Sequence, residues 1–207
     1  MYIDQIPLLK KALATGLLGW EAQRLMLPLK TDKYQEPHTN SKQAGVSVIL
    51  YPDVEGVIQA VFIKRPAHPL DKHSGQISFA GGQKEQSDVD LQATALREME
   101  EELGIARGEA QVLGALTSMY VYVSDFYVEP YVVYLDDRPQ YLLQASEVDY
   151  VIEIPLTRLI NQSSVTTDIF VRNTTLKDVP YYDLNGDVLW GATAMITSEL
   201  IEMVRRL

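Results

Sequence analysis

A run of acidic residues in the middle of the chain has a spacing that suits a metal site. Between Leu91 and Leu103, helical geometry of about 100° per residue places Glu98, Glu101 and Glu102 on one face. Like charges at these spacings repel by roughly a few tenths of a kcal/mol per pair. A divalent cation such as Mg²⁺ or Mn²⁺ would cancel this repulsion, because such cations prefer carboxylate oxygens. The alternative for an arbitrary helix is a solvated acidic face.

Two glycines upstream of the helix favour the metal site over the solvated face. Gly81 and Gly82 have no side chain, so the backbone there can approach other groups closely and leave a carbonyl free as a further ligand. The sequence therefore predicts a site in which a glycine-rich turn faces the glutamates of a helix.

Together, the glycines and the acidic run resemble the motif of the Nudix hydrolases. The second half of that motif reads Arg-Glu-apolar-x-Glu-Glu-x-Gly-apolar, and Arg97 to Ile105 matches every specified position. Gly82 to Asp88 keeps the spacing of the first half, with Asp where Glu is usual. Eight residues rather than seven then separate Asp88 from Arg97. The helix face is unaffected by these differences, while the role of Asp88 stays open.

The flanks of the motif look like the coenzyme A pyrophosphatase branch of this family. Residues 63–65, IKR, and residues 70–82, LDKHSGQISFAGG, are similar to its signature. Asp71 stands where the branch usually has Arg, and Ala80 where it usually has Pro. Residues 189–194, LWGATA, are similar to its Trp-Gly-x-Thr-Ala pattern. The resemblance covers about residues 45 to 205.

This resemblance implies a fold and a reaction. The implied fold is an α/β/α sandwich around a mixed central sheet. The implied reaction is metal-dependent hydrolysis of a diphosphate in a nucleoside diphosphate derivative, here coenzyme A or acyl-CoA giving 3′,5′-ADP and (acyl-)4′-phosphopantetheine. Two alternatives are open: the same chemistry on ADP-ribose or another dinucleotide, and a nucleotide-binding regulator without catalysis. The resemblance also suggests a homodimer.

The resemblance assigns roles to single residues as well. We expect Glu98, Glu101, Glu102 and the carbonyl of Gly82 to bind Mg²⁺ or Mn²⁺, with Glu101 as a further ligand or the general base. Arg97 is expected to pair with a glutamate and hold its rotamer, so that Arg97, Glu98 and Glu101 form the catalytic set. The metal would neutralise diphosphate oxygens and make bound water a better nucleophile.

Further candidates lie outside the helix. Arg65, Lys72 and His73, together with Lys64, form a local basic group that we expect to bind the phosphates of the substrate. Ordinary surface charge is the alternative for this group. Glu147 precedes an expected strand, where many Nudix enzymes carry a late glutamate near the metals. The alternative for Glu147 is a solvated charge at the edge of a strand.

Apolar periodicity and turn residues predict the elements that position these candidates. Residues 1–44 are expected to form a helical extension and a loop, and residues 45–207 the hydrolase domain. We expect helices at 3–27, 91–103, 155–160 and 194–207, and strands at 46–50, 57–64, 147–154, 181–184 and 188–190. Residues 111–135 are expected to form two strands split around Ser124-Asp125. This order of strands and isolated helices predicts a mixed sheet flanked by helices.

Composition and charge exclude several classes of function. The chain has 207 residues, a net charge of −10 and no cysteine, so a disulfide scaffold, a thiol nucleophile and a zinc-thiolate site are excluded. The acidic balance argues against nucleic-acid binding. A membrane span needs about 20 apolar residues and none is visible, so we expect a cytoplasmic protein. Residues 84–102 carry seven acidic and two basic side chains, where a divalent cation would reverse the local field.

Overall fold

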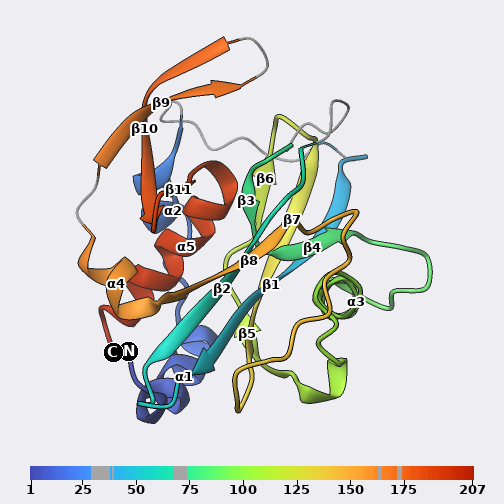
Figure 1. Ribbon diagram of the computed structural model, residues 1–207, viewed down its shortest axis with the longest axis vertical. Coiled ribbons are helices and arrows are strands. Elements are labelled where there is room, and N and C mark those ends of the chain that lie inside the picture. The colour runs from blue at the N-terminus through green and yellow to red at the C-terminus, as the bar shows by residue number, and fades with distance from the viewer. Residues whose placement is uncertain (29–37, 39, 68–73, 163–164, 172–173) are drawn as a thin grey trace.

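A mixed eight-stranded sheet forms the middle layer of the molecule (Figure 1). The computed structural model describes residues 1–28, 38, 40–67, 74–162, 165–171 and 174–207. The strands of this sheet are β1 (Lys42–Pro52), β2 (Ile58–Lys64), β3 (Ile77–Ser78), β4 (Ala80–Gln83), β5 (Gln111–Ala115), β6 (Met119–Val121), β7 (Phe126–Tyr134) and β8 (Tyr150–Pro155). Their order is β3-β2-β1-β7-β5, with β4 paired to β1, β6 to β7 and β8 to β2. The β1–β7 pair is parallel and the other pairs are antiparallel.

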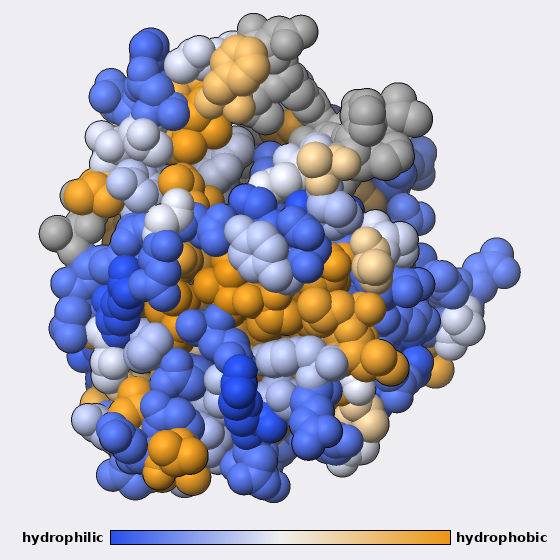
Figure 2. All heavy atoms as spheres, in the orientation of Figure 1, coloured by the Kyte–Doolittle hydropathy of each residue, from blue (hydrophilic) through white to orange (hydrophobic). Residues whose placement is uncertain are grey.

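Helices cover both faces of the central sheet, as the side view in Figure 1 shows. They are α1 (Ile6–Thr15), α2 (Trp20–Gln23), α3 (Leu91–Leu103), α4 (Leu156–Asn161) and α5 (Gly191–Val204), with short 3₁₀ turns at Ile3–Gln5, Arg24–Met26 and Arg107–Glu109. Side chains alternate along β1, so that Val48 and Leu50 pack in the core beneath α1 and α5, whereas Ile49 and Tyr51 pack in the core beneath α3. The predicted α/β/α sandwich with a mixed sheet is confirmed. Figure 2 shows apolar side chains gathered at the centre of this view, where the edge of the sheet lies, with hydrophilic side chains around them.

Helix α3 has the predicted bounds because both of its ends carry sequence signals. The carboxylate of Asp90 accepts a hydrogen bond from the Ala93 N–H at 2.7 Å and caps the first turn. At the other end Gly104 takes the left-handed conformation, with φ of 72°. Gly45 of β1 lets the helix approach the sheet, since a Cβ there would stand 2.1 Å from the Leu91 carbonyl oxygen.

The N-terminal helices pack into the core beneath α5. Leu9 and Leu13 of α1 are buried together with side chains of the central sheet. The carboxylate of Glu199, on α5, accepts hydrogen bonds from the Gly19 N–H at 2.8 Å and from the Gln23 side-chain amide at 3.0 Å. The first 27 residues are therefore tied to the last helix of the chain.

Several strands differ from those that periodicity predicts. β1 begins at Lys42, inside the expected loop, because residues 42–50 pair in parallel with β7. Residues 111–135 form three strands instead of two, and the strand expected at 147–154 begins at Tyr150. Periodicity does not predict β3 and β4, because β3 has only two residues and β4 contains Gly81 and Gly82. The closing helix begins at Gly191 and ends at Val204, which leaves Leu207 exposed beyond it.

A second sheet of three strands contains the strands expected at 181–184 and 188–190, which form a hairpin with its turn at Asn185-Gly186. Its strands are β9 (Val165–Val171), β10 (Thr174–Leu184) and β11 (Asp187–Leu189). Both turn residues have positive φ, 62° and 103°, as a tight hairpin of this kind requires. Periodicity did not predict β9 and the first half of β10, because most of their described side chains are exposed. None of the helices in the described part of the chain has the length and apolar character that crossing a bilayer requires.

Candidate active site

Three glutamates from two separate segments converge beside α3. Carboxylate oxygens of Glu98, Glu102 and Glu147 all lie within 4.8 Å of one another. Glu98 and Glu102 lie one turn apart on α3, and Glu147 belongs to the chain between β7 and β8. Three carboxylates this close repel one another unless a proton or a cation intervenes. Oxygen donors of this charge and spacing suit a hard divalent cation.

Glu102 is the most deeply buried member of the group, with 1% of its surface exposed. The backbone N–H of Gly81 donates a hydrogen bond to its Oε2 at 3.0 Å. Burial raises the pKa of Glu102 to about 8, while the Gly81 N–H and the positive charge of Arg65 act in the opposite direction. A bound cation would supply the compensating charge that this carboxylate lacks.

Glu98 lies directly against the backbone of the glycine-rich strand β4. A Cβ on Gly82 would stand 2.3 Å from Glu98 Oε1, so any side chain at this position would displace the carboxylate. Burial raises the pKa of Glu98, and the charge of Arg97 opposes that shift. The proximity of Gly82 fits a role for its carbonyl as a ligand, and that role stays a prediction.

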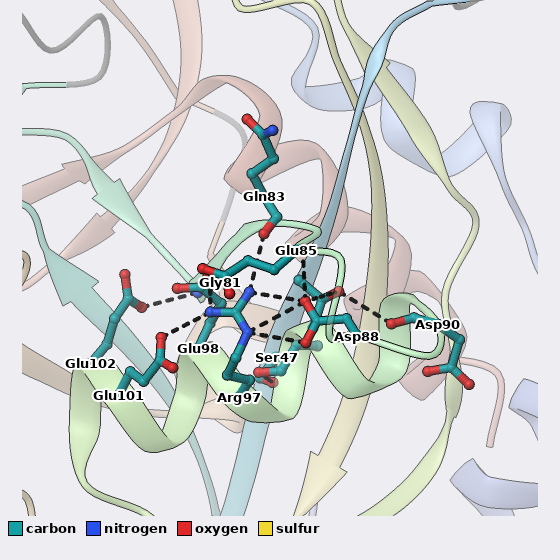
Figure 3. Close-up of polar contacts among 12 residues, drawn as sticks. Ser47, Gly81, Gln83, Glu85, Asp88, Asp90, Arg97, Glu98, Glu101 and Glu102 are labelled. Carbon is teal, nitrogen blue, oxygen red and sulfur yellow. Dashed lines mark hydrogen bonds and ion pairs between the residues drawn. The ribbon is translucent and has the colours of Figure 1, made fainter.

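Arg97 is the hub of the hydrogen bonds around α3 (Figure 3). Its Nη2 donates to Asp88 Oδ2 at 3.0 Å and to the Gln83 carbonyl oxygen at 3.1 Å. Its Nη1 donates to Glu101 Oε2 at 2.8 Å and lies 3.0 Å from Glu98 Oε1. The guanidinium is buried and joins the helix to the turn that precedes it, so it limits the positions that the Glu98 carboxylate can take.

Asp88, whose role the sequence left open, is a buried anchor for Arg97. Its carboxylate also accepts hydrogen bonds from the Glu85 N–H at 2.9 Å and the Thr94 hydroxyl at 3.0 Å. The hydrogen bond from Arg97 lowers the pKa of Asp88 to about 2. In the described residues Asp88 is not part of the three-glutamate group. Asp88 lies before the helix, nine positions from Arg97, so helical periodicity does not predict its contact with Arg97.

Glu101 lies apart from the three-glutamate group. Its side chain is 54% exposed, and its carboxylate accepts a hydrogen bond from Arg97. Helical spacing predicts Glu101 on the same face as Glu98 and Glu102, but one step of about 100° from Glu102 is enough to turn its side chain from the sheet towards solvent. A role for Glu101 as ligand or general base stays a prediction.

Glu147 reaches the group because the chain that carries it is tied to α3 and β2. The Gln144 N–H donates to the carbonyl of Glu102 at 3.0 Å, and the Glu147 N–H donates to the carbonyl of Gln144 at 2.9 Å. Two residues further, the Asp149 N–H donates to the Lys64 carbonyl at 2.8 Å. Only the family resemblance pointed to Glu147, since no local spacing relates it to residues 45 positions earlier.

The basic candidates have different surroundings. Lys64 Nζ lies 3.3 Å from Asp187 Oδ1 in β11, so this lysine is paired across the two sheets. Arg65 follows β2, and its positive charge acts to lower the pKa of Glu102. Lys72 and His73 lie outside the described residues.

The chain is similar to known proteins in both sequence and fold. The sequence profile of the NUDIX domain matches residues 41–162. A protein of Photorhabdus laumondii named "Uncharacterized Nudix hydrolase NudL" is 30% identical over 166 residues, which cover 80% of this chain and 87% of that relative. A protein of the same name from Yersinia pestis is 29% identical over 181 residues, covering 87% of this chain and 90% of the relative.

Solved structures share the fold at low sequence identity. The Nudix hydrolase RenU of M. smegmatis has a TM-score of 0.56 at 10% identity, covering 86% of this chain and 97% of its own. A MutT/nudix family protein from Enterococcus faecalis has a TM-score of 0.51 at 14% identity, covering 100% of this chain and 75% of its own.

Proposed function

This chain belongs to the Nudix hydrolase family, and on that premise we propose that it hydrolyses the diphosphate of a nucleoside diphosphate derivative at the three-glutamate group. One observation carries the assignment of the site: carboxylate oxygens of Glu98, Glu102 and Glu147 lie within 4.8 Å of one another. Nudix hydrolases use divalent metal ions, and this donor set fits Mg²⁺ or Mn²⁺.

The residues of the site have three different tasks in this proposal: holding the metal, positioning a ligand and taking up a proton. Glu98, Glu102 and Glu147 would hold the metal, with the Gly82 carbonyl as a further donor. When bound, the metal supplies Lewis-acid stabilisation of the phosphate oxygens and activates water. Arg97 holds Glu98 in place through its bonds to Asp88 and Gln83. Glu101 is half-exposed and tethered to Arg97, and it would take the proton from the attacking water as general base.

The substrate that we propose is coenzyme A or an acyl-CoA, split into 3′,5′-ADP and (acyl-)4′-phosphopantetheine. Support comes from the sequence similarities at residues 63–65, 70–82 and 189–194. Arg65, whose charge acts on Glu102, would bind a phosphate of this anionic substrate, with Lys72 and His73 as further contacts. Lys64 is set apart from this task by its ion pair with Asp187.

A substrate panel tests this assignment. The purified protein is incubated with Mg²⁺ or Mn²⁺ and, separately, with coenzyme A, acetyl-CoA, ADP-ribose and a diadenosine polyphosphate, and the products are identified by mass spectrometry. We expect 3′,5′-ADP from coenzyme A. Cleavage of ADP-ribose or the dinucleotide alone would replace the substrate and keep the chemistry. Saturable binding without any product would contradict catalysis and favour a nucleotide-binding regulator.

A further inference from the structure

A second carboxylate, Glu153 of β8, gathers hydrogen bonds from three side chains. The hydroxyl of Tyr51 donates to Glu153 Oε1 at 2.6 Å, and the hydroxyl of Tyr141 donates to the same atom at 2.9 Å. The guanidinium of Arg138 donates to Oε2, with Nη2 at 2.7 Å. Burial acts to raise the pKa of Glu153, but the hydrogen bonds from Arg138 and the tyrosines outweigh it and lower the pKa. The carboxylate is therefore ionised near neutral pH and is a strong acceptor.

Two of these donors belong to the segment that carries Glu147. Residues 135–149, called here the connecting segment, join β7 to β8 and contain neither helix nor strand. Figure 1 shows the connecting segment passing on the side of the sheet where α3 lies. Arg138 and Tyr141 lie in its first half and Glu147 in its second half. By contrast, Glu153 lies on β8 and Tyr51 on β1, two strands that both pair with β2 in the central sheet and form a fixed base.

The connecting segment is anchored at two levels. In its middle, the Leu142 N–H donates to the Leu103 carbonyl at 2.8 Å and the Gln144 N–H donates to the Glu102 carbonyl at 3.0 Å, so the backbone is fixed to the end of α3. Before Leu142, the side-chain bonds to Glu153 hold Arg138 and Tyr141 against the sheet. A segment without its own ladder of backbone hydrogen bonds depends on such anchors for a fixed position.

We propose that Glu153 is a positioning residue for the metal site, which holds the first half of the connecting segment so that Glu147 stays beside Glu98 and Glu102. This inference rests on the proposed function, because it takes Glu147 as a metal ligand. Ligand carboxylates need supporting contacts to keep their geometry, and loss of such support typically weakens metal binding by about 10–100-fold. Glu153 acts through the connecting segment and not through a direct bond to Glu147. We therefore expect its loss to weaken metal binding about tenfold, at the lower end of this range.

The test is a double-mutant cycle on metal affinity, measured by titrating the metal-free protein with Mn²⁺ and following free Mn²⁺ by electron paramagnetic resonance. We expect Glu153→Gln to weaken Mn²⁺ binding about tenfold in the otherwise unchanged chain. In a chain that already carries Glu147→Gln, the same change should have almost no further effect, because the residue through which Glu153 acts is gone. An equal loss in both backgrounds, or no loss in either, would overturn the inference.

A matched control separates positioning from general stability. Glu199, like the half-buried Glu153, accepts hydrogen bonds from several donors. It is fully buried and lies on α5, beneath the opposite face of the sheet. Glu199→Gln should lower the melting temperature and leave Mn²⁺ affinity unchanged. Should Glu199→Gln weaken Mn²⁺ binding as much as Glu153→Gln, the effect of Glu153 is one of stability and the inference is wrong.

Two milder variants keep the test decisive if Glu153→Gln does not fold. Arg138 has a 67% exposed side chain, so Arg138→Gln should fold and weaken Mn²⁺ binding about threefold, and Tyr51→Phe less. Unchanged Mn²⁺ affinity in both variants would overturn the inference. Absence of Mn²⁺ binding in the unchanged chain would instead overturn the proposed function, and with it this inference.

Discussion

Two buried glutamates on opposite sides of the central sheet differ in what surrounds their carboxylates. Glu199, on α5, is fully buried. Its oxygens accept hydrogen bonds from the backbone of Gly19, the side chain of Gln23, and both the backbone N–H and the hydroxyl of Thr117, at 2.6–3.1 Å. These donors satisfy the carboxylate completely and join α2, α5 and the chain before β6. Glu199 is a structural residue.

Glu102, on α3, is buried almost as deeply but has different neighbours. It accepts a backbone hydrogen bond from Gly81 and lies within 4.8 Å of carboxylate oxygens of Glu98 and Glu147. Burial of a charge is tolerated when donors or counter-charges compensate it. The protein supplies less of this compensation at Glu102 than at Glu199. The comparison shows that burial alone does not mark a site. At Glu102 like charges meet, and we propose that a cation completes their surroundings.

The largest expected effect follows from removing the charge of Glu102. Glu102→Gln should lower the hydrolysis rate about 10³-fold, because losing a metal ligand removes several kcal/mol of transition-state stabilisation at about 1.4 kcal/mol per tenfold. The melting temperature of the metal-free protein should stay the same or rise, since a buried charge with raised pKa is removed. Steady-state kinetics and thermal unfolding check this.

Glu100→Gln is the matched control on the same helix. Glu100 pairs with Arg107 at the surface and is outside the three-glutamate group, so its replacement should leave the rate within about twofold. Near-normal hydrolysis by Glu102→Gln would show that the metal site has been assigned to the wrong residues.

A methyl group on Gly82 should be nearly as harmful as the loss of a ligand. Gly82→Ala places a Cβ 2.3 Å from Glu98 Oε1, so the carboxylate must move away from the group. We expect the rate to fall about 10²-fold, with a smaller change in stability. Gly108→Ala serves as the control, because a Cβ at Gly108 meets nothing within 4 Å. Equal activity of the two variants would contradict the close packing of β4 against α3.

Glu199→Gln should lower stability and leave the hydrolysis rate unchanged, which is the opposite of what we expect for Glu102→Gln. In Glu199→Gln, one carboxylate oxygen becomes an amide that faces hydrogen-bond donors, so we expect a loss of about 3 kcal/mol in the free energy of unfolding. That corresponds to a melting temperature lower by roughly 6–12 °C, measurable by calorimetry. The rate per folded molecule should be unchanged. A variant with normal stability but slow hydrolysis would show that Glu199 contributes to catalysis and is not a structural residue.

A smaller effect is expected in the pH dependence of stability, to which Glu102 should contribute and Glu199 should not. Burial raises the pKa of Glu102 to about 8 from an ordinary value of 4.5. Since the folded-state pKa lies above the unfolded one, the contribution of Glu102 to stability is full below about pH 4.5 and is lost as the pH rises through about 8.

The metal-free protein should therefore melt at lower temperature as the pH increases from about 5 to 8, and Mg²⁺ should raise the melting temperature more at pH 8 than at pH 6. Glu102→Gln should remove most of this dependence, whereas Glu199→Gln should retain it. The same pH profile in all three proteins would mean that Glu102 titrates normally.

How far the fold can be predicted from the sequence differs between α3, β9 and the N-terminal helices, for physical reasons. The ends of α3 were predictable because Asp90 and Gly104 are local signals, and the buried stripe of Ala95, Met99 and Leu103 follows from helical spacing. β9 was not predictable because its described side chains are mostly exposed and its pairing with β10 has no apolar periodicity. The N-terminal helices were expected, but their hydrogen bonds to Glu199 depend on long-range packing.

The site was predictable only as far as it is local. Spacing of four residues on a helix brought Glu98 and Glu102 together. Glu147 lies 45 residues further along and joins them through hydrogen bonds that residues 142–149 make with α3 and β2, which no sequence spacing encodes. The contact between Asp88 and Arg97 could not be predicted from the sequence either, because it depends on how the turn before the helix closes.

We propose that Glu147 forms the metal site together with Glu98 and Glu102. Crystals of the protein grown with Mn²⁺ and measured near the manganese absorption edge test it most directly. We expect an anomalous peak at direct ligand distance, about 2.1 Å, from a carboxylate oxygen of each of the three residues. A manganese ion bound by Glu98, Glu101 and Glu102 without Glu147, or a peak elsewhere on the molecule, would contradict the account.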